Sequence, residues 1–144
     1  MARALQAEGD LNGAAAEYRQ ALRLAPTHAE SHIGLGTVLL EKGNFSGAFV
    51  EFQAAARLKP DDQRAHYNAG LVLYAKGDPA SLETATSEYR EAIRLRPSDA
   101  DVHYAFGAAL LRQGNFDAAI SEYREALRLA PARALVREQL RQAL

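Results

Sequence analysis

The chain has 144 residues, no Cys and no Trp, and 17 basic against 18 acidic side chains, giving a formal net charge of −1. Its residues are 48% apolar and 24% charged, a balance typical of a folded protein and not of a disordered one. Near-neutral charge disfavours binding to nucleic acid or to an anionic membrane surface, and the lack of Cys excludes disulfides, thiolate zinc sites and Cys nucleophiles.

The N-terminal residues predict only part of a helix. Met1 to Glu8 precedes Gly9-Asp10, which reads as a helix stop followed by a helix start, and a second helical run then reaches Ala25. No apolar run is long enough for a signal peptide or a membrane span. We therefore expect a soluble protein without membrane insertion, and favour the cytoplasm over the periplasm. Abundant Ala and Arg with few β-branched residues predict an all-α fold.

Proline marks an internal repeat. Pro26, Pro60, Pro97 and Pro131 each follow a helical run, at spacings of 34, 37 and 34 residues. A period in this range indicates stacked units that bury their apolar faces against one another.

Each unit contains two helical patterns joined by a turn that is built on Gly and followed by Asp or Asn. Gly permits the left-handed conformation that ends a helix, and the Asp or Asn side chain can cap the next one. After each turn, a small residue, an aromatic residue and an Ala recur at spacings of four and three, which places them on one helix face. The sets are Ala14/Tyr18/Ala21, Ala48/Phe52/Ala55, Ala85/Tyr89/Ala92 and Ala119/Tyr123/Ala126.

The first helical pattern of three units completes a known repeat. It reads His32-x2-Leu35-Gly36-x2-Leu39, His66-x2-Ala69-Gly70-x2-Leu73 and His103-x2-Phe106-Gly107-x2-Leu110. Together with the small-aromatic-Ala sets and the prolines, this resembles the tetratricopeptide repeat (TPR) family, whose unit reads W-x2-L-G-x2-Y, A-x3-F and P. Here His replaces Trp and Leu replaces Tyr three times. The resemblance implies a right-handed superhelical solenoid of antiparallel helix pairs.

We expect one array over residues 1–144, with an incomplete first unit at about 1–28, units at 29–62, 63–99 and 100–133, and a capping helix at 134–144. This gives nine helices. The third unit has three extra residues, Pro79-Ala80-Ser81. Asp78 as the cap and Pro79 at the first helical position predict that the second helix of this unit begins about one turn early.

The titratable residues do not form a catalytic or metal-binding pattern. The equivalent histidines His32, His66 and His103 should lie a repeat width apart, and Glu17, Glu51, Glu88 and Glu122 recur as on a solvated helix face. No Ser stands in a Gly-x-Ser-x-Gly context. We expect no catalysis, no cofactor and no metal.

The first helix of each unit carries a second, largely apolar stripe. In the family, first helices line a concave groove, so the resemblance implies that this stripe faces a shared channel; the alternative is that adjacent helices cover it. The stripe comprises Ile33, Thr37 and Leu40, then Tyr67, Leu71 and Tyr74, then Tyr104, Ala108 and Leu111.

The groove lacks the cations of the two-carboxylate clamp found in heat-shock co-chaperones. Arg64 and Asn68 stand at comparable positions, but Ile33, Thr37, Asp101 and Ala105 occupy the others. An acidic C-terminal tail is therefore a disfavoured ligand, although Asn68 can bond a ligand backbone.

The sequence favours a non-enzymatic module that binds an extended or helical segment of another protein in its groove. One alternative is a scaffold that assembles with copies of itself through the N-terminal edge, where Leu5 and Leu11 should be partly exposed. Another is a regulatory array cut from a longer enzyme.

Metal independence is testable at once. Because no ligand cluster is expected, a chelator removes nothing that binds the folded state, and the melting temperature should be the same with and without EDTA. A drop of several degrees in differential scanning fluorimetry would contradict the reading of the histidines.

Overall fold

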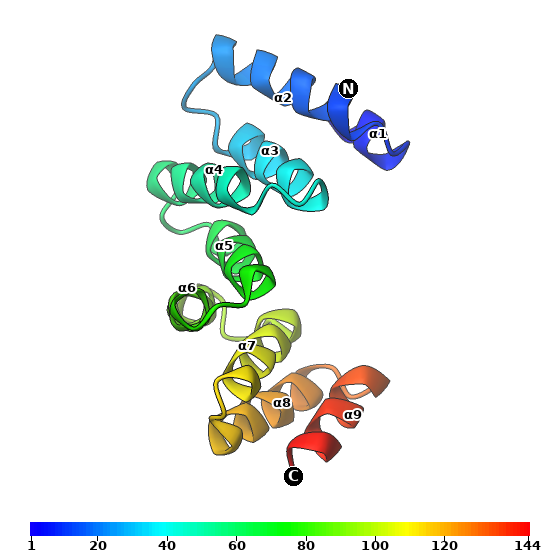
Figure 1. Ribbon diagram of the computed structural model, residues 1–144, viewed down its shortest axis with the longest axis vertical. Coiled ribbons are helices and arrows are strands. Elements are labelled where there is room, and N and C mark those ends of the chain that lie inside the picture. Colours follow the sequence, from blue (N-terminus) through cyan, green and yellow to red (C-terminus); the bar gives the residue numbers. More distant parts are fainter.

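The structure is a computed structural model that describes residues 1–144 and consists of nine helices without strands (Figure 1). The chain runs along the long axis of the molecule, with its two termini at opposite ends (Figure 1). Consecutive helices pack in pairs, and the pairs stack into the superhelical solenoid that the repeat predicts. The helices are α1 Ala2–Ala7, α2 Leu11–Leu24, α3 Ala29–Glu41, α4 Phe45–Leu58, α5 Gln63–Lys76, α6 Pro79–Leu95, α7 Ala100–Arg112, α8 Phe116–Leu129 and α9 Ala134–Ala143. None is both long and apolar enough to cross a membrane.

The turn between α5 and α6 shows how each pair is joined. Gly77 ends α5 in the left-handed region with φ 74°, which only Gly adopts without strain. Asp78 then caps α6 by accepting a hydrogen bond from the Ser81 backbone N–H, at 2.9 Å. Pro79 occupies the first turn of α6, which has 17 residues against 14 in α2, α4 and α8. The predicted early start of this helix is confirmed.

The core of each pair is an aromatic ring of the second helix that lies against a glycine of the first helix. Phe52, Tyr89 and Tyr123 are fully buried. A Cβ atom built on Gly70 would lie 2.5 Å from Cε1 of Tyr89, closer than real Cβ contacts allow. Gly36 and Gly107 stand in the same relation to Phe52 and Tyr123, at 2.7 Å and 2.8 Å. The absence of a side chain at these glycines therefore lets the two helices approach.

The ends of the solenoid are covered unequally. Helix α1 contains no buried residue, and Leu5 and Leu11 are half-buried, which agrees with the expected partial exposure of this edge. At the other end, α9 packs on α8 and buries Val136 and Ala143 in the core cluster. The last helix thus covers an apolar face that α8 would otherwise expose.

Two tyrosine hydroxyls lack partners inside this core. The hydroxyl groups of Tyr89 and Tyr123 are buried and make no hydrogen bond, whereas the equivalent second helix in the preceding unit carries Phe52. Burial disfavours the charged phenolate, so it raises the pKa of Tyr123 to about 12 and that of Tyr89 further still.

Replacing Tyr89 or Tyr123 by Phe should therefore raise the free energy of unfolding by ~1–2 kcal/mol, because a buried polar group without a partner is costly. Urea unfolding of each variant measures this change. Tyr18→Phe is the matched control, since its ring lines an open pocket, and it should change stability by less than ~0.5 kcal/mol. A loss above ~1 kcal/mol in Tyr89→Phe and Tyr123→Phe would mean that the hydroxyls have partners.

The same tyrosines predict a stability loss in alkali. A tyrosine of the unfolded chain ionises near pH ~10, whereas folding raises the pKa of Tyr123 to about 12. Ionisation of these tyrosines therefore leaves the free energy of unfolding unchanged below pH ~10. The free energy of unfolding falls as pH rises towards 12, because the unfolded state then releases protons that the folded state retains. Urea unfolding between pH 9 and about 11 should show this fall, and the Tyr89→Phe/Tyr123→Phe double variant should show a shallower one.

Candidate functional site

The second stripe of the first helices lies on α3, α5 and α7. Ile33 is the most covered member, with 8% of its surface exposed, and belongs to the N-terminal core cluster. The remaining members are half-buried: Thr37, Leu40, Tyr67, Leu71, Tyr74, Tyr104, Ala108 and Leu111. Adjacent helices thus cover the stripe only partly, and most of its side chains remain partly exposed to solvent.

Two tyrosines of the stripe pack against buried tyrosine rings of the core. The Tyr67 ring centroid lies 6.3 Å from that of Tyr89, and the Tyr104 centroid lies 5.9 Å from that of Tyr123. Burial raises the pKa of both stripe hydroxyls, and the nearby carboxylates of Asp101 and Asp99 add to the effect at Tyr67. Each of these two rings thus packs on a core ring and stays partly exposed.

Arg112, the last residue of α7, covers the third tyrosine of the stripe. Its guanidinium lies 4.8 Å from the centroid of the Tyr74 ring, a cation–π contact, and Nη1 donates a hydrogen bond to the Tyr74 carbonyl at 2.9 Å. Arg112 was not among the residues predicted from the sequence. Nothing in its local pattern distinguishes it from other arginines at helix ends, and only the stacking of α7 on α5 brings it to Tyr74.

A pocket of about 450 Å³ lies at the N-terminal end of the stripe, among α1, α2 and α3. Ile33 and Thr37, both predicted groove residues, line it together with Gly34 and the Tyr18 ring. A Cβ atom at Gly34 would collide with Tyr18, so this close approach of α3 to α2 depends on glycine. The other lining residues are Arg3, Gln6, Ala7, Glu30 and Glu41.

The side chain of Arg64, predicted to face a ligand, is engaged within the chain. Its guanidinium pairs with Glu30 of α3 and with Asp62, the latter at 2.6 Å, and this pairing lowers the pKa of both carboxyl groups. Arg64 is therefore not a free cation for a ligand carboxylate. Asn68 makes no hydrogen bond within the chain and is half-buried, so its amide stays available.

Related contacts join successive first helices along the same rim. Arg3 of α1 pairs with Glu30 at 3.5 Å, and the Gln63 amide of α5 donates to Asp99 at 3.0 Å. Arg133, before α9, pairs with Asp101 of α7. These contacts link the N-terminal ends of α3, α5 and α7 to one another and to the terminal helices.

The three equivalent histidines each bond a glutamate of the following helix. Nδ1 of His32 lies 2.7 Å from Glu51, that of His66 2.8 Å from Glu88, and that of His103 2.6 Å from Glu122. From the sequence, these glutamates were predicted to lie on a solvated face. That prediction is wrong, because helix pairing brings each carboxylate beside a histidine 19 or 22 residues away.

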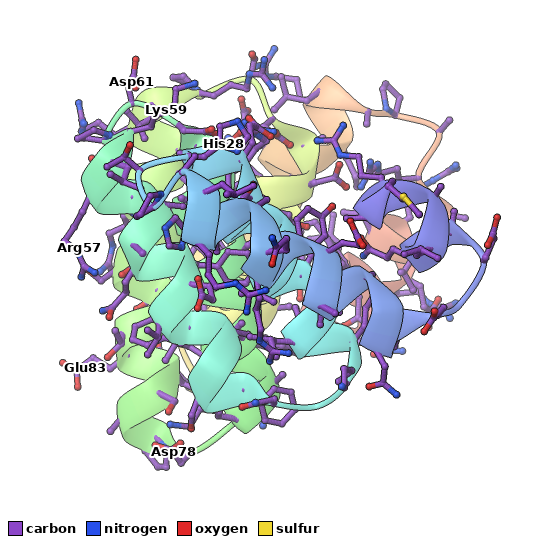
Figure 2. All side chains as sticks on the ribbon, turned by 90° about the horizontal axis from the view of Figure 1, so that it is seen from above. His28, Arg57, Lys59, Asp61, Asp78 and Glu83 are labelled. Atoms are coloured by element: carbon purple, nitrogen blue, oxygen red, sulfur yellow. The ribbon has the colours of Figure 1, made fainter.

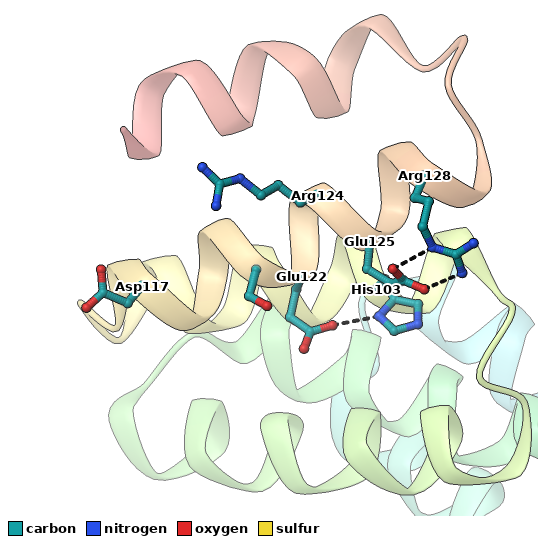
Figure 3. Close-up of a pocket in the computed structure, with 7 residues that line it drawn as sticks. His103, Asp117, Glu122, Arg124, Glu125 and Arg128 are labelled. Carbon is teal, nitrogen blue, oxygen red and sulfur yellow. Dashed lines mark hydrogen bonds and ion pairs between the residues drawn. The ribbon is translucent and has the colours of Figure 1, made fainter.

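Figure 3 shows this contact at His103 within a pocket of about 470 Å³ that has no hydrophobic lining residue. In the same pocket, the Arg128 guanidinium donates two hydrogen bonds to the Glu125 carboxylate, at 2.8 Å and 2.6 Å. No group of three or more His, Cys, Asp or Glu side chains comes together to hold a metal ion.

Some charged side chains lie at the periphery of the solenoid, away from the stripe. Figure 2 shows Arg57, Lys59, Asp61, Asp78 and Glu83 at its periphery, and all five are exposed. These exposed charged positions contrast with the half-buried apolar and aromatic residues of the stripe.

Comparison with known structures gives the same fold. A crystal structure of MamA aligns with a TM-score of 0.91 and 22% identity, covering 99% of this chain and 82% of that one. MamA 41-end from Desulfovibrio magneticus RS-1 aligns with a TM-score of 0.90 and 20% identity, covering 99% and 78% of the two chains. The first TPR of Spaghetti (RPAP3), bound to the HSP90 peptide SRMEEVD, aligns with a TM-score of 0.76 and 18% identity, covering 80% of this chain and 89% of that one.

Sequence comparison identifies the family. No curated protein matches the chain. The family model described as the TPR domain of cytochrome c-type biogenesis protein H matches residues 5–135, which is most of the sequence. The predicted TPR repeat is thus confirmed, and the chain belongs to the family of cytochrome c-type biogenesis protein H TPR domains.

Proposed function

We propose that the stripe on α3, α5 and α7 is a binding groove for a segment of another protein. The observation that carries the proposal is that eight of its nine residues are half-buried. Most of these side chains pack against the buried core and remain partly accessible to solvent. Side chains already ordered by packing lose little conformational freedom on binding, and Tyr offers apolar area together with a hydroxyl.

The groove chemistry favours a ligand that presents apolar side chains. Arg64 is paired with Glu30 and Asp62, and Arg133 with Asp101, so an acidic tail finds few free cations. The RPAP3 repeat is described with the acidic peptide SRMEEVD, but its 18% identity supports a shared fold and not a shared ligand. The family description supports the proposal that this binding serves cytochrome c-type biogenesis.

Site-specific photo-crosslinking tests the location of the groove. A photoreactive amino acid at Ala108, on the stripe, should capture a protein partner in cells of the source organism. The same residue at Ser121, exposed on α8, is the matched control and should not. Equal capture at both positions, or none at Ala108, would reject the groove.

A titration with the captured segment tests the aromatic contacts. Tyr104→Ala should weaken binding by ~1–3 kcal/mol, as removal of a central aromatic contact does. Tyr67→Ala should do so as well, but with some loss of stability, because its ring packs on Tyr89. Gly70→Leu should cost ~1–3 kcal/mol of folding free energy by overpacking the helix contact. If Tyr104→Ala binds as tightly as the parent in calorimetry, the tyrosines are core residues only.

Self-assembly remains the alternative proposal. Met1 is 89% exposed, and Leu5 and Leu11 are half-buried at the N-terminal edge. Light scattering, which measures the molar mass in solution, distinguishes the two functions. A monomer over a wide concentration range would reject self-assembly. A dimer that dissociates when Leu5 is replaced in Leu5→Glu would support it.

A further inference from the structure

Helix α1 covers only part of the helix with which it pairs. It has six residues, whereas the other first helices, α3, α5 and α7, have 13, 14 and 13. By the 34-residue repeat, Ala2 stands at the position of Gly36, so α1 supplies only the last turns of a first helix. Figure 1 shows α1 beside the N-terminal end of α2. The C-terminal half of α2 therefore lacks the first helix that covers its equivalents.

The exposure of equivalent residues shows this gap. In α2, the core ring of Tyr18 is 8% exposed, and Ala21 is half-buried. In the three other second helices, the equivalent ring and alanine are fully buried: Phe52/Ala55, Tyr89/Ala92 and Tyr123/Ala126. Further along, Leu24 is 78% exposed, against 37% for the equivalent Leu58. The residues of α2 that would face a complete first helix are thus partly open to solvent.

An unpaired carboxylate lies on the same side of α2. Glu17 is exposed and makes neither an ion pair nor a hydrogen bond within the chain. In the other units, the equivalent glutamate lies within 2.8 Å of Nδ1 of a first-helix histidine: His32–Glu51, His66–Glu88 and His103–Glu122. Helix α1 does not reach the histidine position, so Glu17 has no such partner.

The space in front of α1 is an open pocket. It has a volume of about 500 Å³ and is lined by Tyr18 of α2, by the first three residues of the chain and by the start of α3. The α3 side of the pocket is already bonded, because Nδ1 of His28 lies 2.8 Å from Oγ of Ser31 and Glu30 pairs with arginines. The pocket therefore offers apolar surface from Tyr18, while the free carboxylate on α2 is Glu17.

We propose that Glu17, Tyr18, Ala21 and Leu24, here called the α2 face, form a second docking surface that accepts a helix of another protein. The occupant has about two turns, because α1 is seven residues shorter than the 13-residue α3. It presents a histidine or a basic side chain to Glu17 and an apolar side chain three residues later. The first helices of this chain carry the same order: His32/Leu35, His66/Ala69 and His103/Phe106.

The last helix of a second copy does not fit the α2 face. Helix α9 has the repeat position of a first helix, and its Arg137 would face Glu17. However, Arg141 stands where α7 carries Gly107, and even a Cβ atom at that glycine would lie 2.8 Å from the ring of Tyr123. On the α2 face, Arg141 would collide with Tyr18, at a position that Ala2 of α1 already fills. A helix of a different protein is therefore the occupant. This inference does not depend on the proposed groove.

A helical peptide of known sequence tests the surface on the full chain. The probe is Ser98–Phe106 of this sequence, stapled as a helix between the positions of Asp101 and Ala105, which lie on another side of the helix from His103. Titrated to millimolar concentration into 15N-labelled protein, it should shift the amide resonances of Tyr18, Ala21 and Leu24. The resonance of Ala108, in the proposed groove, should not move. Shifts at Ala108 alone, or none on α2, would overturn the inference.

Paired variants test the charge contact. Glu17→Ala should weaken binding of the probe by about threefold or more, because the histidine loses its carboxylate. His103→Ala in the probe should have the same effect, and combining the two changes should weaken binding no further. Glu83→Ala, at an exposed glutamate of α6, is the matched control and should bind as the parent does. Equal affinities of the parent and Glu17→Ala would overturn the proposed chemistry of the occupant.

Light scattering of the full chain separates a foreign helix from a second copy. If the α2 face takes a helix of another protein, the chain alone should not associate through it, and Leu24→Glu should leave the molar mass unchanged. A dimer that dissociates in Leu24→Glu would mean that a second copy occupies the face, and would overturn the inference.

Discussion

The approach of an aromatic ring to a glycine sets the spacing of the helix pairs. Phe52, Tyr89 and Tyr123 are buried against Gly36, Gly70 and Gly107, where even one added carbon would collide with the ring. Dense packing of this kind leaves no room for adjustment, so neighbouring units must repeat nearly the same geometry. The regular solenoid follows from this contact, as does the alignment of the first helices along one surface.

Polar contacts then fix how the closely packed helices are oriented. Each histidine on a first helix meets a glutamate on the second, and pairs such as Arg64–Glu30 connect one unit to the next. The Arg64–Glu30 pair is exposed, and exposed ion pairs typically contribute only ~0–1 kcal/mol each. The histidine–glutamate pairs are more buried and join the two helices of one unit.

The proposed groove depends on both kinds of contact. The core rings Tyr89 and Tyr123 pack against Tyr67 and Tyr104, and the rim contacts join α3 to α5 and α5 to the N-terminal end of α7. A surface organised before the ligand arrives loses less freedom on binding than a flexible one. Arg64 is paired in these rim contacts, so the proposed groove is apolar and aromatic with few free cations.

The sequence by itself determined the repeat, the nine helices, the early start of α6 at Pro79 and the face on which each groove residue lies. These depend on spacing along the chain, and helical periodicity converts spacing into position. Only the tertiary structure decided that Glu51, Glu88 and Glu122 meet histidines, that Arg64 is already paired and that Arg112 covers Tyr74. Those contacts join residues 19 to 38 positions apart, and a repeating charge pattern looks the same whether its members face solvent or a neighbouring helix. The rotation and separation of adjacent helices, set by the buried rings, determine which of them meet.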